Sequence, residues 1–176
     1  MIDSIWLLRI VEDTVVDGPG FRTAVYGSGC NHRCKGCHNP HSWNKENGEQ
    51  YTIQEVADKI LMNPVSDVTF TGGDPFYQAE AFGRLAELIK KRSNKKIWCY
   101  TGYCFEEVVR HSGFRHLLSQ IDILVDGPFI QDLHEPGLLF RGSRNQRLID
   151  VRLSLIHNRV IEWNYNPFPV FEKETL

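Results

Sequence analysis

The chain has 176 residues, of which 41% are hydrophobic and 24% charged, as in an ordinary globular domain with one core. Its formal net charge of −2 argues against a broad basic surface for nucleic acid or for an anionic membrane. The first residues, "MIDSIWLLRIVED", hold only a short apolar run that Arg9 interrupts. They predict neither a signal peptide nor a membrane span, so we expect a cytoplasmic protein.

Strand-like and helix-like patterns alternate along the chain. Alternating or β-branched residues predict strands at 21–29, 67–73, 96–102 and 121–127. Apolar residues on one face predict helices at 52–61, 79–91 and 105–111. In the first helix, Thr52 and Glu55 have the spacing of a capping box. This order predicts an α/β fold of βαβ units with a mainly parallel sheet.

The number of predicted units is too small for an eight-fold barrel. We therefore predict an open, partial barrel that forms a single domain over 1–176. From about residue 148 the pattern weakens, and we expect short strands followed by an irregular, proline-containing tail.

Glycine or polar residues stand where the predicted strands end. These positions are Gly29–Cys30, Gly72–Gly73, Thr101–Gly102 and Asp126–Gly127. The carboxyl ends of parallel strands meet at one edge of a sheet, and ligands of α/β folds bind there. The sequence thus predicts a binding site that combines these strand ends.

Three of the five cysteines, Cys30, Cys34 and Cys37, form a C-x3-C-x2-C pattern. They are too tightly clustered for a disulfide framework and favour metal ligation in a reducing cell. Thiolates favour zinc or an iron–sulfur cluster. Each cysteine would bind a separate iron of a four-iron cluster, leaving the fourth iron without a protein ligand. Gly29 and Gly36 permit the turns that this wrapping needs.

A zinc site is the alternative that spacing alone leaves open. Structural zinc prefers a closed tetrahedral shell, which His32, His38 or His41 would complete. The remaining cysteines, Cys99 and Cys104, are interpreted as packed thiols.

Two motifs in order resemble the radical S-adenosylmethionine (SAM) enzymes. The cysteine pattern follows the first predicted barrel strand, and "TGGDP" (71–75) follows the next. The segment "VVDGPGFRTAVYGSGCNHRCKGCHNPHSW" (15–43), with Asp17, Gly18 and Gly20 before the cysteines, resembles the glycyl-radical-enzyme activases.

Three further segments resemble one group among these activases. "WCYTGY" (98–103), "ILVDGPFIQDL" (123–133) and "FRGSRNQR" (140–147) look like the activases that serve anaerobic ribonucleoside-triphosphate reductase. The resemblance extends from about Val15 to Arg147.

The resemblance implies an oxidoreductase with a radical SAM domain. Cys30, Cys34 and Cys37 would hold one 4Fe–4S cluster, and SAM would chelate the open iron. Reductive cleavage of SAM would give a 5′-deoxyadenosyl radical, which would generate a glycyl radical on the large subunit of the reductase. A low-potential, flavodoxin-like protein would supply the electron.

The resemblance also implies the residues around SAM. These are Gly36, Cys37, His38, Gly72, Gly73, Asp74, Pro75, Tyr100, Thr101 and Asp126. His38 would lie beside the adenine, and the turn from Gly72 to Pro75 would bind the methionine amino group. Asp126 would lie near the SAM carboxylate, although an aspartate at a strand end also caps the next turn.

A run of arginines follows the last of these segments. By resemblance, Arg141, Arg144 and Arg147 would border the active site or the interface with the reductase, although such a run is usually a solvated loop.

Two positions depart from the superfamily pattern. Asp74 stands where a glutamate is common, and we expect little effect because the role of this motif is largely carried by the backbone. Pro128 stands where some relatives have a lysine, so no lysine–carboxylate contact is expected there.

Two other functions compete with this interpretation. One is another small radical SAM enzyme, such as a 7-carboxy-7-deazaguanine synthase. The other is a non-enzymatic cysteine module, either a zinc-stabilised interaction domain or an electron carrier. A carrier cluster normally has four cysteine ligands, and a zinc domain leaves "TGGDP" without a role.

Overall fold

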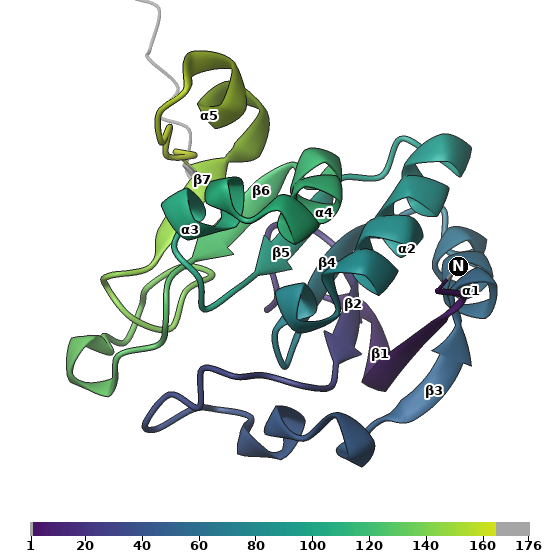
Figure 1. The fold of residues 1–176 in the computed structure, drawn as a ribbon, viewed down its shortest axis with the longest axis horizontal. Helices are drawn as coiled ribbons and strands as arrows, with labels where there is room; N and C mark the ends of the chain where they lie inside the picture. The colour runs from purple at the N-terminus through teal and green to yellow at the C-terminus, as the bar shows by residue number, and fades with distance from the viewer. Residues whose placement is uncertain (1, 165–176) are drawn as a thin grey trace, which may run out of the picture.

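The computed structural model describes residues 2–164, which form a seven-stranded sheet in the order β3-β1-β2-β4-β5-β6-β7 (Figure 1). The strands are β1 (Ser4–Thr14), β2 (Arg22–Gly27), β3 (Glu49–Thr52), β4 (Asp67–Gly72), β5 (Ile97–Tyr100), β6 (Ile123–Asp126) and β7 (Arg147–Asp150).

The centre of the sheet is parallel. β2, β4, β5 and β6 pair in parallel, whereas β1 is antiparallel to both β2 and β3, and β7 is antiparallel to β6. Consequently β3 points in the same direction as the four central strands, and only β1 and β7 run the other way in the described chain. β3 and β7 stand at opposite ends of the order, so the sheet is open. The predicted α/β fold with a mainly parallel, open sheet is confirmed.

Helices α1 to α4 lie on one side of this sheet, and α5 lies beyond β7 (Figure 1). The helices are α1 (Ile53–Met62), α2 (Ala79–Arg92), α3 (Phe105–Arg110), α4 (Arg115–Gln120) and α5 (Val151–His157). The predicted capping box is confirmed, because Thr52 Oγ1 accepts from the Glu55 amide and Glu55 Oε2 accepts from the Thr52 amide. Within residues 2–164, no helix has the length and apolar character needed to cross a membrane.

The main core lies between the sheet and these helices. Val68 and Phe70 of β4 face the helices, and Phe82 of α2 meets Phe70 with ring centroids 5.0 Å apart. Leu85 and Ile89 continue the same helix face and are fully buried. Burial of these side chains from water is the main favourable contribution to this packing.

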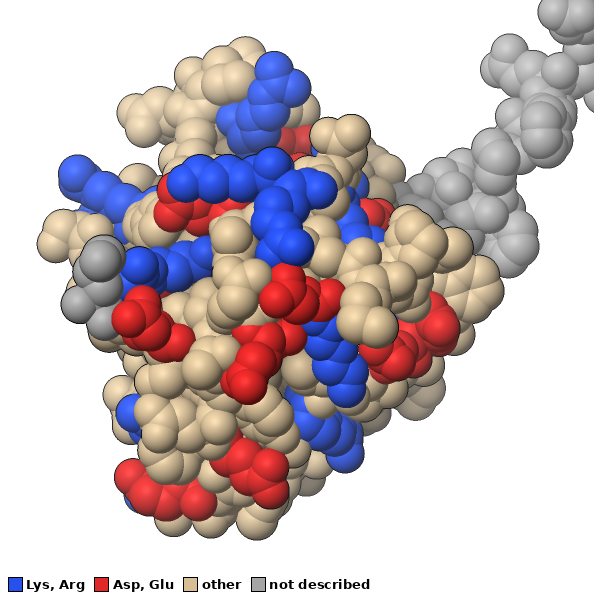
Figure 2. All heavy atoms as spheres, turned by 90° about the vertical axis from the view of Figure 1, so that its right-hand side faces the viewer, with Lys and Arg blue, Asp and Glu red and all other residues tan. Residues whose placement is uncertain are grey.

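The outer surfaces of α1 and α2 carry charges of both signs. Figure 2 shows acidic and basic side chains interspersed on the face that includes α1. Arg92 Nη1 lies 2.7 Å from Asp58 Oδ1, which joins α2 to α1, and Lys91 pairs with Glu87 one turn earlier in α2. Such exposed pairs contribute little stability each but leave no broad field of one sign on this surface.

The opposite face of the sheet holds a smaller cluster built on Trp98, with Val125 and Leu148. Arg22 crosses beside it and is almost fully buried. Its guanidinium donates to Thr69 Oγ1 at 2.6 Å and to the Val68 carbonyl oxygen at 2.6 Å. Burial lowers the pKa of Arg22, and these acceptors compensate for the lost hydration.

The "DGPG" turn supports Arg22 from the N-terminal side. The Asp17 carboxylate accepts from Tyr26 Oη at 3.0 Å, and the Asp17 carbonyl oxygen accepts from Thr69 Oγ1. Gly18 has φ of 136°, and a Cβ there would lie 2.7 Å from Arg22 Cδ. Glycine is required because the chain passes directly over the arginine.

Several elements differ from the sequence expectation. β1 was not predicted, because Ile5 to Leu8 is apolar on both strand faces and hides the alternation. β3 is polar and short, and its pairing with β1 defines it. The expectation of only short strands after residue 148 is wrong, because α5 follows β7 immediately. Its outward Leu155 and Ile156 obscure the helical pattern. The predicted tail lies mostly at 165–176, outside the described residues.

Truncation of Phe82 tests the main core. Phe82→Ala removes a fully buried ring that contacts Phe70, so we expect a loss of about 3–5 kcal/mol in the free energy of unfolding. Met62→Ala, at the exposed end of α1, should change it by less than about 0.5 kcal/mol. Anaerobic urea denaturation of both variants measures the difference, and equal losses would contradict this description of the core.

Candidate iron–sulfur site

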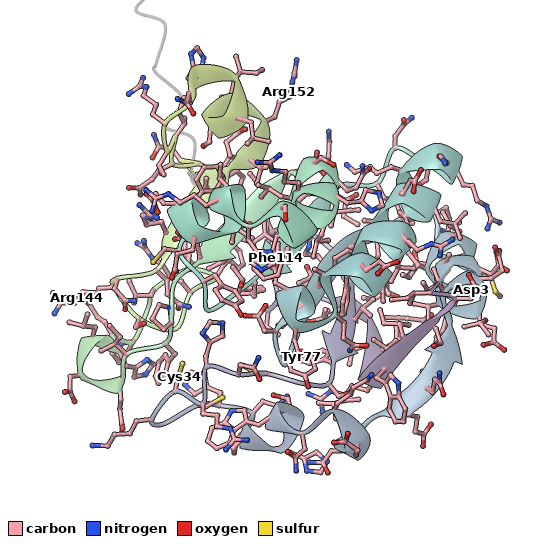
Figure 3. The ribbon with its side chains drawn as sticks, in the orientation of Figure 1. Asp3, Cys34, Tyr77, Phe114, Arg144 and Arg152 are labelled. Atoms are coloured by element: carbon pink, nitrogen blue, oxygen red, sulfur yellow. The ribbon has the colours of Figure 1, made fainter. Side chains whose placement is uncertain are left out.

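The cysteine loop follows β2 directly and runs along the edge where the parallel strands end (Figures 1 and 3). Cys30, Cys34 and Cys37 are free and half-buried. At the start of the loop, the Gly29 amide donates to the Ser42 carbonyl oxygen at 2.7 Å, and the Cys30 amide donates to that of Trp43 at 3.1 Å. The loop therefore begins at a fixed point on the fold.

Two glycines bend the loop where the sequence predicted turns. Gly29 and Gly36 have φ of 99° and 74°, in the region that favours glycine. A Cβ at Gly29 would lie 2.3 Å from the Tyr77 ring, and one at Gly36 would lie 2.9 Å from the Gln131 side chain. Any larger residue would be strained in its backbone and would also collide with a neighbour.

The glycines of "TGGDP" bring β4 against the start of the cysteine loop. The Gly73 amide donates to the Gly27 carbonyl oxygen at 2.8 Å, and the Asp74 amide donates to that of Gly29 at 2.9 Å. A Cβ at Gly73 would lie only 2.3 Å from the Gly29 oxygen. These two amides are thus committed to the cysteine loop, and the close approach that glycine permits is between two segments of the chain.

The Asp74 side chain is only 3% exposed and joins several segments. It accepts from Phe76 N at 2.9 Å, Thr101 Oγ1 at 3.0 Å and Gly102 N at 3.0 Å. Its Oδ2 also lies 2.8 Å from His32 Nε2. Besides its backbone, this position therefore also has a structural role through its side chain, which the sequence analysis did not predict. Pro75 follows as the first residue of the short 3₁₀ turn Pro75–Gln78.

The three histidines considered for zinc each have another partner. His32 bonds to Asp74, and His41 Nδ1 lies 3.4 Å from Asn47 Nδ2. His38 packs on Phe129, with ring centroids 4.8 Å apart. Across residues 2–164, no three Cys, His, Asp or Glu side chains converge on one metal position. The arrangement does not support the zinc alternative.

The donor set fits a cluster better than a single ion. A tetrahedral ion requires sulfur atoms that converge to about 2.3 Å from one point, whereas a cluster binds each thiolate through a different iron. Cys30, Cys34 and Cys37 are free and stand on one loop, which is the donor set that the second requirement needs. Burial raises the pKa of Cys30, so iron binding would have to offset the cost of ionising this thiol.

Two predicted residues at the end of β5 occupy different environments. Thr101 is buried and bonds through its hydroxyl to Asp74, which places it next to "TGGDP". Tyr100 lies on the opposite face beside Trp98, with ring centroids 6.4 Å apart, and burial raises its pKa. The structure thus brings Thr101, but not the Tyr100 ring, to Asp74.

Asp126 ends β6 and is 1% exposed. Its carboxylate accepts from the Phe105 amide at 2.7 Å, at the start of α3, and from Arg147 Nε at 3.1 Å. Arg147 also pairs with Glu106 at 2.9 Å, and the two acids raise the pKa of Arg147. These contacts tie Asp126 to the start of α3 and to Arg147 of β7 rather than to the turn that follows β6.

The three arginines of "RGSRNQR" do not gather into one site. Arg147 belongs to the Asp126 pair, whereas Arg144 is exposed, 3.4 Å from Glu135, and points outward in Figure 3. Arg141 Nη1 donates to the Gln146 carbonyl oxygen, and its buried Nε has no partner among the described residues. Their common sequence motif therefore conceals three different environments.

The segment from Pro128 to Gln146 nevertheless lies on the cysteine loop. Gln131 contacts Gly36, and Phe129 contacts His38. Sequence reasoning missed Phe129 and Gln131, and it assigned His32 only to the zinc alternative. Their partners are distant along the chain, so no local spacing identifies them.

Comparison with known proteins identifies the class of this domain. A model of the 4Fe-4S single cluster domain matches residues 16–149, which defines the chain as an iron–sulfur domain of that class.

Several relatives are named anaerobic ribonucleoside-triphosphate reductase-activating proteins. The one from Vibrio cholerae is 41% identical over 141 residues, covering 75% of this chain and 89% of the relative. That of enterobacteria phage T4 is 36% identical over 146 residues, covering 80% and 90%, and that of Haemophilus influenzae is 35% identical over 149 residues, covering 79% and 94%. The chain belongs to the family of anaerobic ribonucleoside-triphosphate reductase-activating proteins.

Two arginines of the same motif provide a matched test of the site's frame. Arg147→Ala leaves the buried Asp126 carboxylate without its ion pair, so we expect the free energy of unfolding to fall by about 3–5 kcal/mol. Arg144→Ala should change it by less than about 1 kcal/mol, because its pair with Glu135 is exposed. Thermal or urea unfolding distinguishes the two, and an unaffected Arg147→Ala would contradict the assigned ion pair.

Proposed function

We propose that this protein is a radical SAM activase, an oxidoreductase that generates a glycyl radical on anaerobic ribonucleoside-triphosphate reductase. The observation that carries the proposal is the direct bonding of the three-cysteine loop to the "TGGDP" turn at the ligand edge of an open sheet. The names of its relatives support the reductase as the target. The open sheet is then the partial barrel of a radical SAM domain.

Cys30, Cys34 and Cys37 are the residues that would hold one 4Fe–4S cluster. Once bound, that cluster would supply the electron that breaks a carbon–sulfur bond of SAM, so that the deoxyadenosyl fragment takes a hydrogen atom from a glycine of the reductase. Iron–sulfur potentials extend to about −700 mV, which is in the range that such a reduction needs. A flavodoxin-like donor would restore the electron.

The chain's part in this chemistry is to bind and orient. The loop supplies three thiolates, so one iron is left to a non-protein ligand. The bonds from Gly29 and Cys30 to Ser42 and Trp43 hold the loop at its first cysteine. A loop held in this way would need less ordering when the cofactor binds.

We assign the SAM site to the space between the cysteine loop and the strand ends. Gly36, Cys37 and His38 would form one wall, which Phe129 and Gln131 support from behind.

The turn from Gly72 to Pro75, with Thr101 behind it, would form another wall. Since the Gly73 and Asp74 amides are used within the chain, the turn would present its other backbone groups to the methionine part of SAM.

Asp126 and Tyr100 have supporting roles in this proposal. Asp126 would hold α3 and Arg147 at the strand edge rather than face the SAM carboxylate alone. Tyr100 would line the opposite face of the sheet. The outward Arg144 would belong to the border with the reductase, and Arg141 would border the active site.

Membership of the activase family favours this function over the 7-carboxy-7-deazaguanine synthases. It also gives "TGGDP" a role, which a zinc-stabilised module does not.

The cluster assignment predicts which cysteines SAM cleavage requires. Protein reconstituted anaerobically with iron and sulfide should form 5′-deoxyadenosine from SAM and dithionite. Cys30→Ala, Cys34→Ala and Cys37→Ala should each reduce the rate by at least about 100-fold, because a cluster ligand is lost. Cys104→Ala, a half-buried cysteine outside the loop, should retain the wild-type rate.

Metal analysis of the same samples provides the control. Wild-type protein should contain about four iron and four sulfide per chain, as one 4Fe–4S cluster requires. Stoichiometric zinc without sulfide, or undiminished cleavage in the loop variants, would refute the assignment.

A further inference from the structure

We propose that His32 is a positioning residue that locks the cysteine loop to the "TGGDP" turn through Asp74 and thereby sets the affinity for SAM. This inference rests on the proposed function, because it concerns the same site.

His32 is held from three directions. Its Nε2 lies 2.8 Å from Asp74 Oδ2, and its ring meets the Tyr103 ring edge-on with centroids 4.4 Å apart. A Cβ added to Gly102 would lie 2.4 Å from the His32 ring, so the main chain at the end of β5 also packs against the ring. These contacts define one orientation of the imidazole.

The acceptor of this bond, Asp74, also binds groups from other segments of the chain. Asp74 is 3% exposed and also binds Phe76 N, Thr101 Oγ1 and Gly102 N. Its carboxylate therefore joins the 3₁₀ turn after β4 to the end of β5. Hydrogen bonds to a desolvated carboxylate are strong and are poorly replaced by water.

His32 connects Asp74 to the middle of the cysteine loop. It lies two residues after Cys30 and two before Cys34. The main-chain bonds that fix the loop act at Gly29 and Cys30, before this point. Among the described residues between Cys30 and Cys34, His32 is the one whose side chain bonds to the strand-end region.

Loss of the bond between His32 and Asp74 would release the middle of the cysteine loop from the "TGGDP" turn. The three cysteines would still be present, so a cluster would still assemble. The loop would no longer be held at a fixed distance from the turn that we assign to the methionine part of SAM. The expected consequence is weaker SAM binding, with a KM that rises more than kcat falls. Mutation of a group that orients metal ligands typically lowers metal affinity or activity 10–100-fold.

The first experiment compares three variants of the full-length, reconstituted protein. His32→Ala removes the bond, His32→Gln keeps an amide N–H that donates to Asp74, and His41→Ala removes a histidine farther along the same segment. The readouts are iron per chain, kcat and KM for 5′-deoxyadenosine formation, and the electron paramagnetic resonance spectrum of the reduced cluster with and without SAM.

We expect His32→Ala to keep at least about half of the iron but to raise the KM for SAM about 10-fold or more. When SAM is added at a concentration equal to the wild-type KM, the cluster spectrum of His32→Ala should change less than that of the wild-type protein. His32→Gln should recover most of the KM effect, and His41→Ala should match the wild type. A wild-type KM and spectrum in His32→Ala would overturn the proposal.

A double variant tests whether His32 acts through Asp74. If it does, His32→Ala should change the KM by less than about 2-fold in an Asp74→Asn background, since the shared bond is already weakened. A full 10-fold effect there would refute the pathway through Asp74. If Asp74→Asn fails to fold, the comparison of His32→Ala with His32→Gln decides the question by itself.

Wild-type activity separates this inference from the proposed function. If wild-type protein binds iron and sulfide but does not cleave SAM, the proposed function fails. If the wild type cleaves SAM and His32→Ala does so with the same KM, only the role of His32 fails.

Discussion

The amides of Gly73 and Asp74 donate to the carbonyl oxygens of Gly27 and Gly29, and this contact fixes the candidate site. It joins the end of β4 to the first residues of the cysteine loop with no side chain between them. The approach is possible because Gly73 has no Cβ, which would lie 2.3 Å from the Gly29 oxygen. The start of the cysteine loop and the glycine turn are therefore placed relative to each other by the backbone.

Two buried carboxylates connect the other strand ends of the sheet. Asp74 connects the β4 turn to the end of β5, and Asp126 connects the end of β6 to α3 and to Arg147 on β7. Each carboxylate is almost completely buried and receives several donors. Removing one partner would leave the others around an incompletely neutralised charge, which is costly in a low-dielectric interior. The strand ends are consequently held as a unit, although the sheet itself is open.

Much of this arrangement could be predicted because its signals are local. The C-x3-C-x2-C spacing, the glycines at strand ends and the capping box of Thr52 and Glu55 each depend on neighbours within a few residues. The alternation of strands and helices then predicted the parallel centre of the sheet. Resemblance added the reductase family, which spacing could not supply.

The contacts that were not predicted join residues that are far apart in the sequence. The pairing of His32 with Asp74 spans 42 residues, and that of Asp126 with Arg147 spans 21. The contacts of the Asp74 side chain were not predicted, because only the fold shows the four groups around its carboxylate. Likewise, β3 is a strand because β1 lies beside it, and its four residues carry no strand pattern of their own.

In the function that we propose, the chain transfers radical chemistry to another protein. The most direct measurement is electron paramagnetic resonance of the cognate anaerobic ribonucleoside-triphosphate reductase after incubation with the reconstituted protein, SAM and dithionite. We predict a glycyl radical signal on the reductase that is absent when SAM is omitted or when Cys34→Ala replaces the wild-type protein. A cluster-loaded protein that cleaves SAM yet yields no such signal, or a signal that forms equally well with Cys34→Ala, would contradict this function.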